Sequence, residues 1–151
     1  MRHAITVLAA AVLLSACQTA PPPAVNTTPP RTPAAIQLAA SIDAYKSLVA
    51  QQIMAANGAY TFSGRLPPML PAIVVLDLSV GPDGELKNVH VHRSRDGEAS
   101  AAALAAVRRV QDAFPPAGHL MRRHAKTFDF SETFLFNDQY RFQLRTLSGP
   151  Q

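Results

Sequence analysis

A turn signal at residues 81–84, Gly-Pro-Asp-Gly, constrains the fold of this chain most, because it joins two stretches of alternating side chains. Residues 73–80 precede the turn and residues 85–93 follow it, and apolar residues recur at every second position. A period of two is typical of strands with one buried face, and the glycines allow a tight reversal of the chain. We therefore predict an antiparallel hairpin. Its inward-facing side chains are Val74, Leu76, Leu78, Val80, Val89 and Val91.

Two amphipathic helices are predicted from apolar residues at spacings of three and four. The first begins at Thr32-Pro33 and ends at Asn57-Gly58, so folded structure starts near residue 34. Its buried stripe is Leu38, Ile42, Tyr45, Val49 and Ile53. The second is capped by Ser94 or Asp96 and ends at Phe114-Pro115-Pro116. Its buried side is Ala103, Leu104, Val107 and Val110.

The last part of the chain predicts a second hairpin. Its first strand carries four phenylalanines on one face, namely Phe128, Phe130, Phe134 and Phe136. Asn137-Asp138 is a turn signal, and the side chains after it alternate in the order Tyr140, Arg141, Phe142, Gln143, Leu144 and Arg145. The order helix, strand, strand, helix, strand, strand predicts an α+β domain with an antiparallel sheet and two helices.

The N-terminus reads as a targeting segment. Arg2 and His3 precede an uncharged, mostly apolar stretch at residues 4–14, which is too short to span a bilayer as a helix. The following Leu14-Ser15-Ala16-Cys17 resembles the lipobox of bacterial lipoproteins, whereas an ordinary secretory signal is the alternative. This resemblance implies that the Cys17 thiol receives a diacylglycerol and that cleavage follows, so that Cys17 becomes the acylated first residue. It also implies that Gln18 directs the protein to the outer membrane, facing the periplasm.

Three segments follow from this interpretation. Residues 1–16 are a lipoprotein signal peptide, and residues 17–33 are a lipidated cysteine with a proline-rich tether. Residues 34–151 form the folded domain. The single cysteine excludes an intramolecular disulfide and a multi-cysteine zinc site. A net charge of +4 over 151 residues is a mild bias, so we expect no nucleic-acid partner.

The domain resembles the TonB C-terminal domain family over about residues 72–136. The resemblance rests on the Pro-Asp-Gly turn with its Asn88-Val89 step, on the helix Ala101-Ala102-Ala103-Leu104 running to Arg108-Arg109, and on Phe114-Pro115-Pro116. TonB and TolA proper begin with a transmembrane helix and a long linker, where this chain has a lipobox and a short tether. The resemblance implies the TonB/TolA fold, a non-enzymatic protein- or peptide-binding module, and a link to TonB- or Tol-type envelope transport.

Strand addition is the binding mode that the resemblance favours, because an open sheet edge offers unpaired N–H and C=O groups. The partner is then an extended peptide or an envelope protein, and the lipid on Cys17 provides the membrane contact. We expect the terminal hairpin, at residues 133–147, to be the docking edge. The residues expected to contact the partner are Thr133, Leu135, Arg141, Gln143 and Arg145.

A metal-binding protein or metal-dependent enzyme is the alternative function. His90 and His92 lie at i and i+2 on the outward face of a strand, where two imidazoles can share a divalent ion. A third ligand would have to come from His119 or His124. Ser94 and Asp96 lie near His92, but a helix cap explains them better than catalysis, so we predict no catalytic residue and no cofactor. The basic run at residues 122–126 is a solvated loop or a contact with anionic headgroups.

Overall fold

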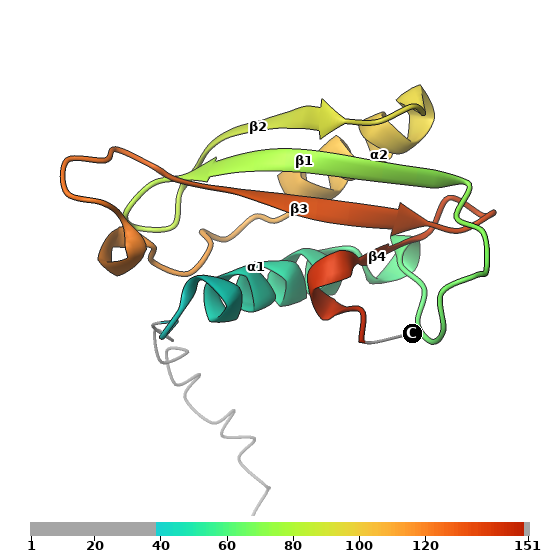
Figure 1. Cartoon of the computed structure of the whole chain (residues 1–151), viewed down its shortest axis with the longest axis horizontal. Helices are drawn as coiled ribbons and strands as arrows, with labels where there is room; N and C mark the ends of the chain where they lie inside the picture. The colour runs from blue at the N-terminus through green and yellow to red at the C-terminus, as the bar shows by residue number, and fades with distance from the viewer. Residues whose placement is uncertain (1–38, 150–151) are drawn as a thin grey trace, which may run out of the picture. The chain divides into compact units, whose positions relative to one another are not determined.

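The computed structural model describes residues 39–149, which lie within one compact unit, Ala35–Gln151. The predicted domain boundary at residue 34 lies outside the described residues. The first helix was predicted to begin at Thr32-Pro33, but it begins at Ile42, because Ser41 before it is extended and caps it. Two α-helices and four strands alternate with three short 3-10 helices (Figure 1). In chain order they are α1 (Ile42–Ala56), η1 (Gly58–Tyr60), β1 (Ala72–Val80), β2 (Leu86–Arg93), α2 (Gly97–Arg108), η2 (Gly118–Leu120), β3 (Phe128–Phe136), β4 (Phe142–Leu144) and η3 (Arg145–Leu147).

The four strands form one antiparallel sheet in the order β2-β1-β3-β4, which confirms the predicted α+β class. β1 pairs with β3 along its whole length, from Ala72 opposite Phe136 to Val80 opposite Phe128. β2 pairs with β1 only as far as Arg93, which lies opposite Val75. Residues 72–74 of β1 therefore extend beyond the end of β2.

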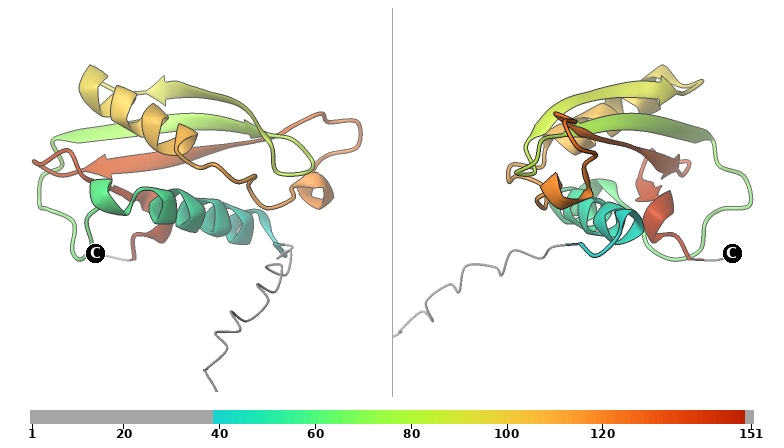
Figure 2. Two further views of the ribbon diagram at one scale, coloured as in Figure 1. Left: turned by 180° about the vertical axis from the view of Figure 1, so that it is seen from behind. Right: turned by 60° about the vertical axis from the view of Figure 1, so that its left-hand side comes forward.

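Both helices cover the same face of the sheet, α2 against β1 and β2, and α1 nearer β4 and η3 (Figure 2). The predicted inward face of β1 is confirmed, because its four apolar side chains are fully buried: Val74, Leu76, Leu78 and Val80. The phenylalanine face of β3 is also confirmed, with Phe134 and Phe136 fully buried and Phe130 only partly so. The other face of the sheet carries the exposed polar side chains of β2 and β3.

Helix α1 begins at Ile42, where the Ser41 hydroxyl accepts a hydrogen bond from the Ala44 N–H at 3.1 Å. Ile42 was expected in the buried stripe but is 52% exposed, because it lies in the first turn at the rim of the domain. The helix ends at Asn57, as predicted. The cause is not a left-handed residue: the Asn57 amide donates to the carbonyls of Ile53, at 2.8 Å, and Ala106, at 2.9 Å.

Helix α2 is capped by Asp96, whose carboxylate accepts the Ala99 N–H at 2.8 Å, and not by Ser94. Ser94 instead braces the turn before the helix through its hydroxyl. The buried side consists of Ala99, Ala103, Ala106 and Val107. Leu104, expected there, is only half-buried, because small alanines let the helix approach the sheet on the neighbouring stripe. Val110 is half-buried but lies beyond the helix, which ends at Arg108 and does not continue to Phe114 as predicted.

The turn between β1 and β2 is packed against the segment that follows α2. Gly84 has a φ of 89°, and its carbonyl accepts the Phe114 N–H at 2.9 Å. The Pro82 carbonyl accepts the N–H groups of Ala117 and Gly118 at 2.9 and 3.0 Å. Residues 114–118 thus close one end of the domain over the predicted turn.

Strand β4 is shorter than the sequence predicts. The alternation was expected to continue through Arg145, but the chain turns into η3 at that residue. The Leu144 carbonyl accepts the Ser148 N–H at 3.1 Å, and one Glu132 oxygen accepts the N–H of Thr133 at 2.9 Å and that of Thr146 at 3.4 Å. The buried Glu132 carboxylate therefore takes the place that a longer β4 would fill.

Candidate functional site

A polar cluster centred on Asp77 lies on the face of the sheet that the helices leave uncovered. His90 and Ser131 are the residues opposite Asp77 on β2 and β3. The Ser131 hydroxyl donates to Asp77 Oδ1 at 2.5 Å, whereas His92 Nδ1 and His90 Nε2 lie 2.9 and 3.5 Å from Oδ2. Both histidines face outward, as the alternation predicts. The structure therefore brings the two candidate metal ligands together around one carboxylate.

The chemistry of this cluster follows from the central position of Asp77. The Ser131 hydrogen bond lowers the pKa of Asp77 most; the hydrogen bond and charge of His92 and the charge of His90 act in the same direction, against a smaller effect of burial. In a nucleophilic triad the histidine takes the proton of the serine, but here Ser131 donates to the carboxylate. The geometry therefore does not activate Ser131 as a nucleophile.

A metal centre requires more ligands than the two histidines. Within residues 39–149, no group of three or more His, Cys, Asp or Glu side chains is arranged to hold a metal ion. His119 lies elsewhere, with Nε2 2.6 Å from the Ala39 carbonyl oxygen, and His124 lies in the exposed loop before β3. The third ligand expected from His119 or His124 is therefore not supplied by this arrangement.

The terminal hairpin does not present its five predicted docking residues as one surface. Leu135 is 3% exposed, and Thr133 is half-buried with its N–H bonded to Glu132. Arg141 is exposed in the turn before β4, and Arg145 is exposed in η3 rather than in a strand. The Gln143 amide donates to the Gly64 carbonyl at 3.0 Å, so this side chain already has a partner within the chain.

The outer edge of β4 is covered by the segment after α1. Thr61 pairs with Phe142 in a parallel bridge, and the Phe62 N–H donates to the Phe142 carbonyl at 3.3 Å. Together with the Ser148 bond to Leu144, this occupies both carbonyls that face outward from β4. A partner strand could pair here only after residues 61–64 move away.

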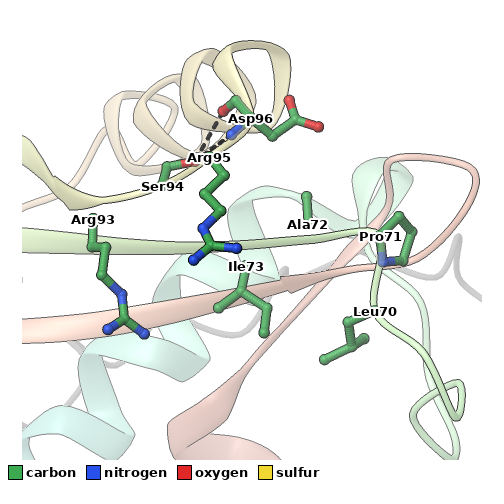
Figure 3. Close-up of a pocket in the computed structure, with 8 residues that line it drawn as sticks. All are labelled: Leu70, Pro71, Ala72, Ile73, Arg93, Ser94, Arg95 and Asp96. Carbon is green, nitrogen blue, oxygen red and sulfur yellow. Dashed lines mark hydrogen bonds between the residues drawn. The ribbon is translucent and has the colours of Figure 1, made fainter.

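A groove that the sequence analysis did not identify lies where β1 runs past the end of β2. It consists of two adjoining hollows of about 500 and 550 Å³ that share Leu70 and Ile73. We call it the β1 groove. Residues 70–73 and 93–96 line one hollow (Figure 3), and residues 65–68 line the other together with Leu70 and Ile73. Ile73 is 46% exposed, and the neighbouring Met69 is 83% exposed. The groove thus combines accessible apolar side chains with a charged rim.

The charges of the β1 groove come from arginines at both ends. Arg93 and Arg95 line one hollow and Arg65 lines the other, and all three are exposed. Asp96 is the acidic residue of the lining, but its carboxylate accepts from the Ala99 N–H and from the Tyr140 hydroxyl. This leaves the groove with a surplus of positive charge. The signal in the sequence is the pair Arg93 and Arg95 just before the helix cap Asp96. The alternation of side chains alone does not distinguish such a pair from the solvated end of a strand.

Two predictions concern a membrane. Cys17, the predicted lipidation site, lies outside the described residues. The basic run at residues 122–126 is an exposed loop between η2 and β3. Neither helix in the described part of the chain has the length and apolar character needed to cross a bilayer.

Comparisons of the chain with protein-family models, with curated proteins and with solved structures find no match in any of the three. The fold class therefore rests on the structure itself. The resemblance to the TonB C-terminal domain family rests on the sequence motifs alone.

Proposed function

We propose that this protein is a lipid-anchored binding module of the cell envelope, held at the outer membrane through Cys17 and facing the periplasm. Its folded domain captures an extended peptide segment of an envelope protein. The observation that carries the proposal is the β1 groove, where three residues of β1 extend past β2 beside accessible apolar side chains. The resemblance to the TonB C-terminal domain supports the same binding mode and a link to TonB- or Tol-type transport.

The β1 groove suits strand addition better than either outer edge of the sheet. The β4 edge is occupied by residues 61–64 and by Ser148. β2 pairs with β1 irregularly near both of its ends, where the register shifts between Val75 and Leu76 and between Ser79 and Val80 of β1. β2 also exposes Lys87. Bulges and lysines are features that discourage pairing at an edge. Residues 72–74, in contrast, are held in an extended conformation by β3.

The backbone of Ile73 offers the pairing groups that such a partner needs. The Phe142 carbonyl points away from β3, since it accepts from Phe62 outside the sheet. Along a strand the N–H and C=O groups of successive residues point to alternate sides, so the N–H and C=O of Gln143 and of Leu135 opposite it face each other. The N–H and C=O of Leu135 therefore point away from β1. Those of Ile73, which lies opposite Leu135, point away from β3 toward the β2 side. No residue of β2 lies opposite Ile73. A short segment in line with β2 can therefore pair there.

Site-specific photo-crosslinking in intact cells tests this function. A crosslinking side chain at Met69, on the rim of the groove, should capture one protein whose crosslinked peptide maps to a single extended segment. The matched control is Ile42, an exposed apolar residue on α1 that takes no part in the groove. Capture of the same partner from Ile42 or Gln143, with none from Met69, would refute the placement of the site.

A further inference from the structure

We propose that the β1 groove reads the C-terminal carboxylate of its partner, with Arg93 and Arg95 as the two cationic groups. The proposal rests on the function proposed above and names the part of the partner that binds. Its basis is the shape of the groove at the end of β2, the charge of its lining, and the hydrogen-bonding state of each polar group there.

The groove has a blind end. A segment that pairs beside Ile73 lies in line with β2. The last residue of β2, Arg93, lies opposite Val75, so β2 fills the position beside β1 only two residues away from Ile73. A partner chain running toward this point meets the backbone of β2 within a few residues. It must either leave the sheet or terminate there. A chain terminus satisfies this geometry without a further turn.

The charge of the blind end selects a carboxylate terminus over an ammonium terminus. In Figure 3 the side chains of Arg93, Arg95 and Ile73 point the same way. Neither guanidinium has a hydrogen bond or ion pair with the described residues. Guanidinium groups pair with a carboxylate through parallel hydrogen bonds, and such charge-assisted bonds are about twice as strong as neutral ones.

The one acidic side chain in the lining does not neutralise these arginines. One Asp96 oxygen caps helix α2 through the Ala99 N–H, and the other accepts the Tyr140 hydroxyl at 2.8 Å. Its backbone is likewise held by the Ser94 hydroxyl, at 2.9 and 3.0 Å. Asp96 therefore holds the position of the blind end, while Arg93 and Arg95 remain available to an incoming anion.

The apolar part of the groove sets the side chain that precedes the carboxylate. Leu70 and Ile73 line both hollows, and Pro71 adjoins them. A peptide paired at Ile73 places alternate side chains on the face of the sheet where Ile73 lies. The partner is therefore an extended chain whose last residues include an apolar side chain and whose terminal carboxylate lies between the two arginines.

The test compares two pools of synthetic heptapeptides, randomised at every position, one with a free C-terminal carboxylate and one with a C-terminal amide. Retention of each pool is measured on the full chain, purified in detergent and immobilised. We expect the free-acid pool to be retained at least about tenfold more strongly, and sequencing of the retained peptides to show apolar residues near the C-terminus. Arg93→Gln and Arg95→Gln should each remove most of the difference. Arg141→Gln, an exposed arginine away from the groove, should leave it unchanged.

The outcomes separate this proposal from the function on which it rests. Equal retention of the two pools by the wild-type chain would overturn carboxylate reading. Retention of amidated peptides enriched in internal aspartate or glutamate would also overturn it, in favour of acidic side chains. In both cases, crosslinking from Met69 would still support peptide capture in the groove. If Arg141→Gln also lost the preference for free-acid over amidated peptides, the domain would be responding to its net charge alone, which would overturn the proposal.

Discussion

The hydroxyl of Tyr140 donates a hydrogen bond to Asp96 Oδ2 at 2.8 Å, across 44 positions of sequence. The other oxygen of the same carboxylate caps helix α2. Tyr140 has a φ of 54° in the turn between β3 and β4, and its ring packs against Phe136 with 6.3 Å between the ring centroids. One carboxylate thus ties the terminal hairpin to the start of α2 and to the wall of the β1 groove.

Replacing Tyr140 by phenylalanine should lower the melting temperature by a few degrees, because the ring contact with Phe136 stays while the bond to Asp96 is lost. Thermal unfolding followed by circular dichroism measures the change. Asp96→Ala should cost more, since it also removes the helix cap. A Tyr140→Phe variant as stable as the wild type would show that the bond contributes nothing to folding.

The same pair predicts a pH dependence with two limits. The Ala99 N–H and then the Tyr140 hydroxyl hold the pKa of Asp96 below its ordinary value, so the stability it contributes is present above about pH 4 and is lost as the pH falls through the lowered value. The hydrogen bond to Asp96 raises the pKa of Tyr140. The stability that the Tyr140 hydroxyl contributes is therefore present below about pH 10 and is lost as the pH rises through the raised value.

Melting temperatures of the wild type and Tyr140→Phe, measured across this range, test both limits. The difference between the two proteins should be largest between the two limits and should shrink at each. A difference independent of pH would contradict the assignment. Tyr45 does not obscure the alkaline limit, because burial raises its pKa to about 12 and it is present in both proteins.

Gly84→Ala should destabilise the domain by about 2–5 kcal/mol, because the left-handed backbone and the lack of space act together. A Cβ at this position would lie 1.8 Å from the Phe114 carbonyl oxygen. Gly64→Ala is a matched control, since Gly64 has a φ of 95° but open space around it, and it should cost only about 1 kcal/mol. Denaturant unfolding gives both values, and equal losses would mean that residues 114–118 do not press on the turn.

Leu76→Ala should cost about 2–5 kcal/mol, because the side chain is fully buried between the sheet and the helices. His90→Ala, on the opposite face and exposed, should change the free energy of unfolding by less than about 0.5 kcal/mol. Leu104→Ala should lie between the two, since Leu104 is half-buried. Similar losses in Leu76→Ala and His90→Ala would show that the register of β1 is shifted by one residue.

Cys17→Ala tests the membrane anchor. If the lipobox is used, the variant should leave the membrane fraction or persist as an uncleaved precursor, because no acyl chain is attached. Mass spectrometry of the wild-type protein should show a mature chain beginning at an acylated Cys17. An unmodified cysteine would contradict the lipoprotein assignment.

The elements that the sequence predicts correctly are those fixed by local patterns. The first hairpin follows from alternation on both sides of Gly84, and the helix stop at Asn57 from its position after the apolar stripe. The end of β4 could not be predicted, because it depends on Glu132 reaching Thr146 from another part of the chain. The β1 groove could not be predicted for the same reason. It exists because β2 reaches only to the position opposite Val75, whereas β1 begins three residues before it at Ala72. This difference depends on the register of the two strands and not on their composition.

The covered edge at β4 also limits how copies of this domain can associate. Because residues 61–64 and the Glu132 carboxylate occupy that side, a second copy can extend the sheet only from the side of β2 and the β1 groove. Two copies that pair through this same side are related by a two-fold axis and form a closed dimer. An open-ended stack of copies requires two free sides on each copy. Extension of the sheet therefore stops at two copies of this domain and does not build a fibre, and the side of the β1 groove is the one through which the sheet can extend.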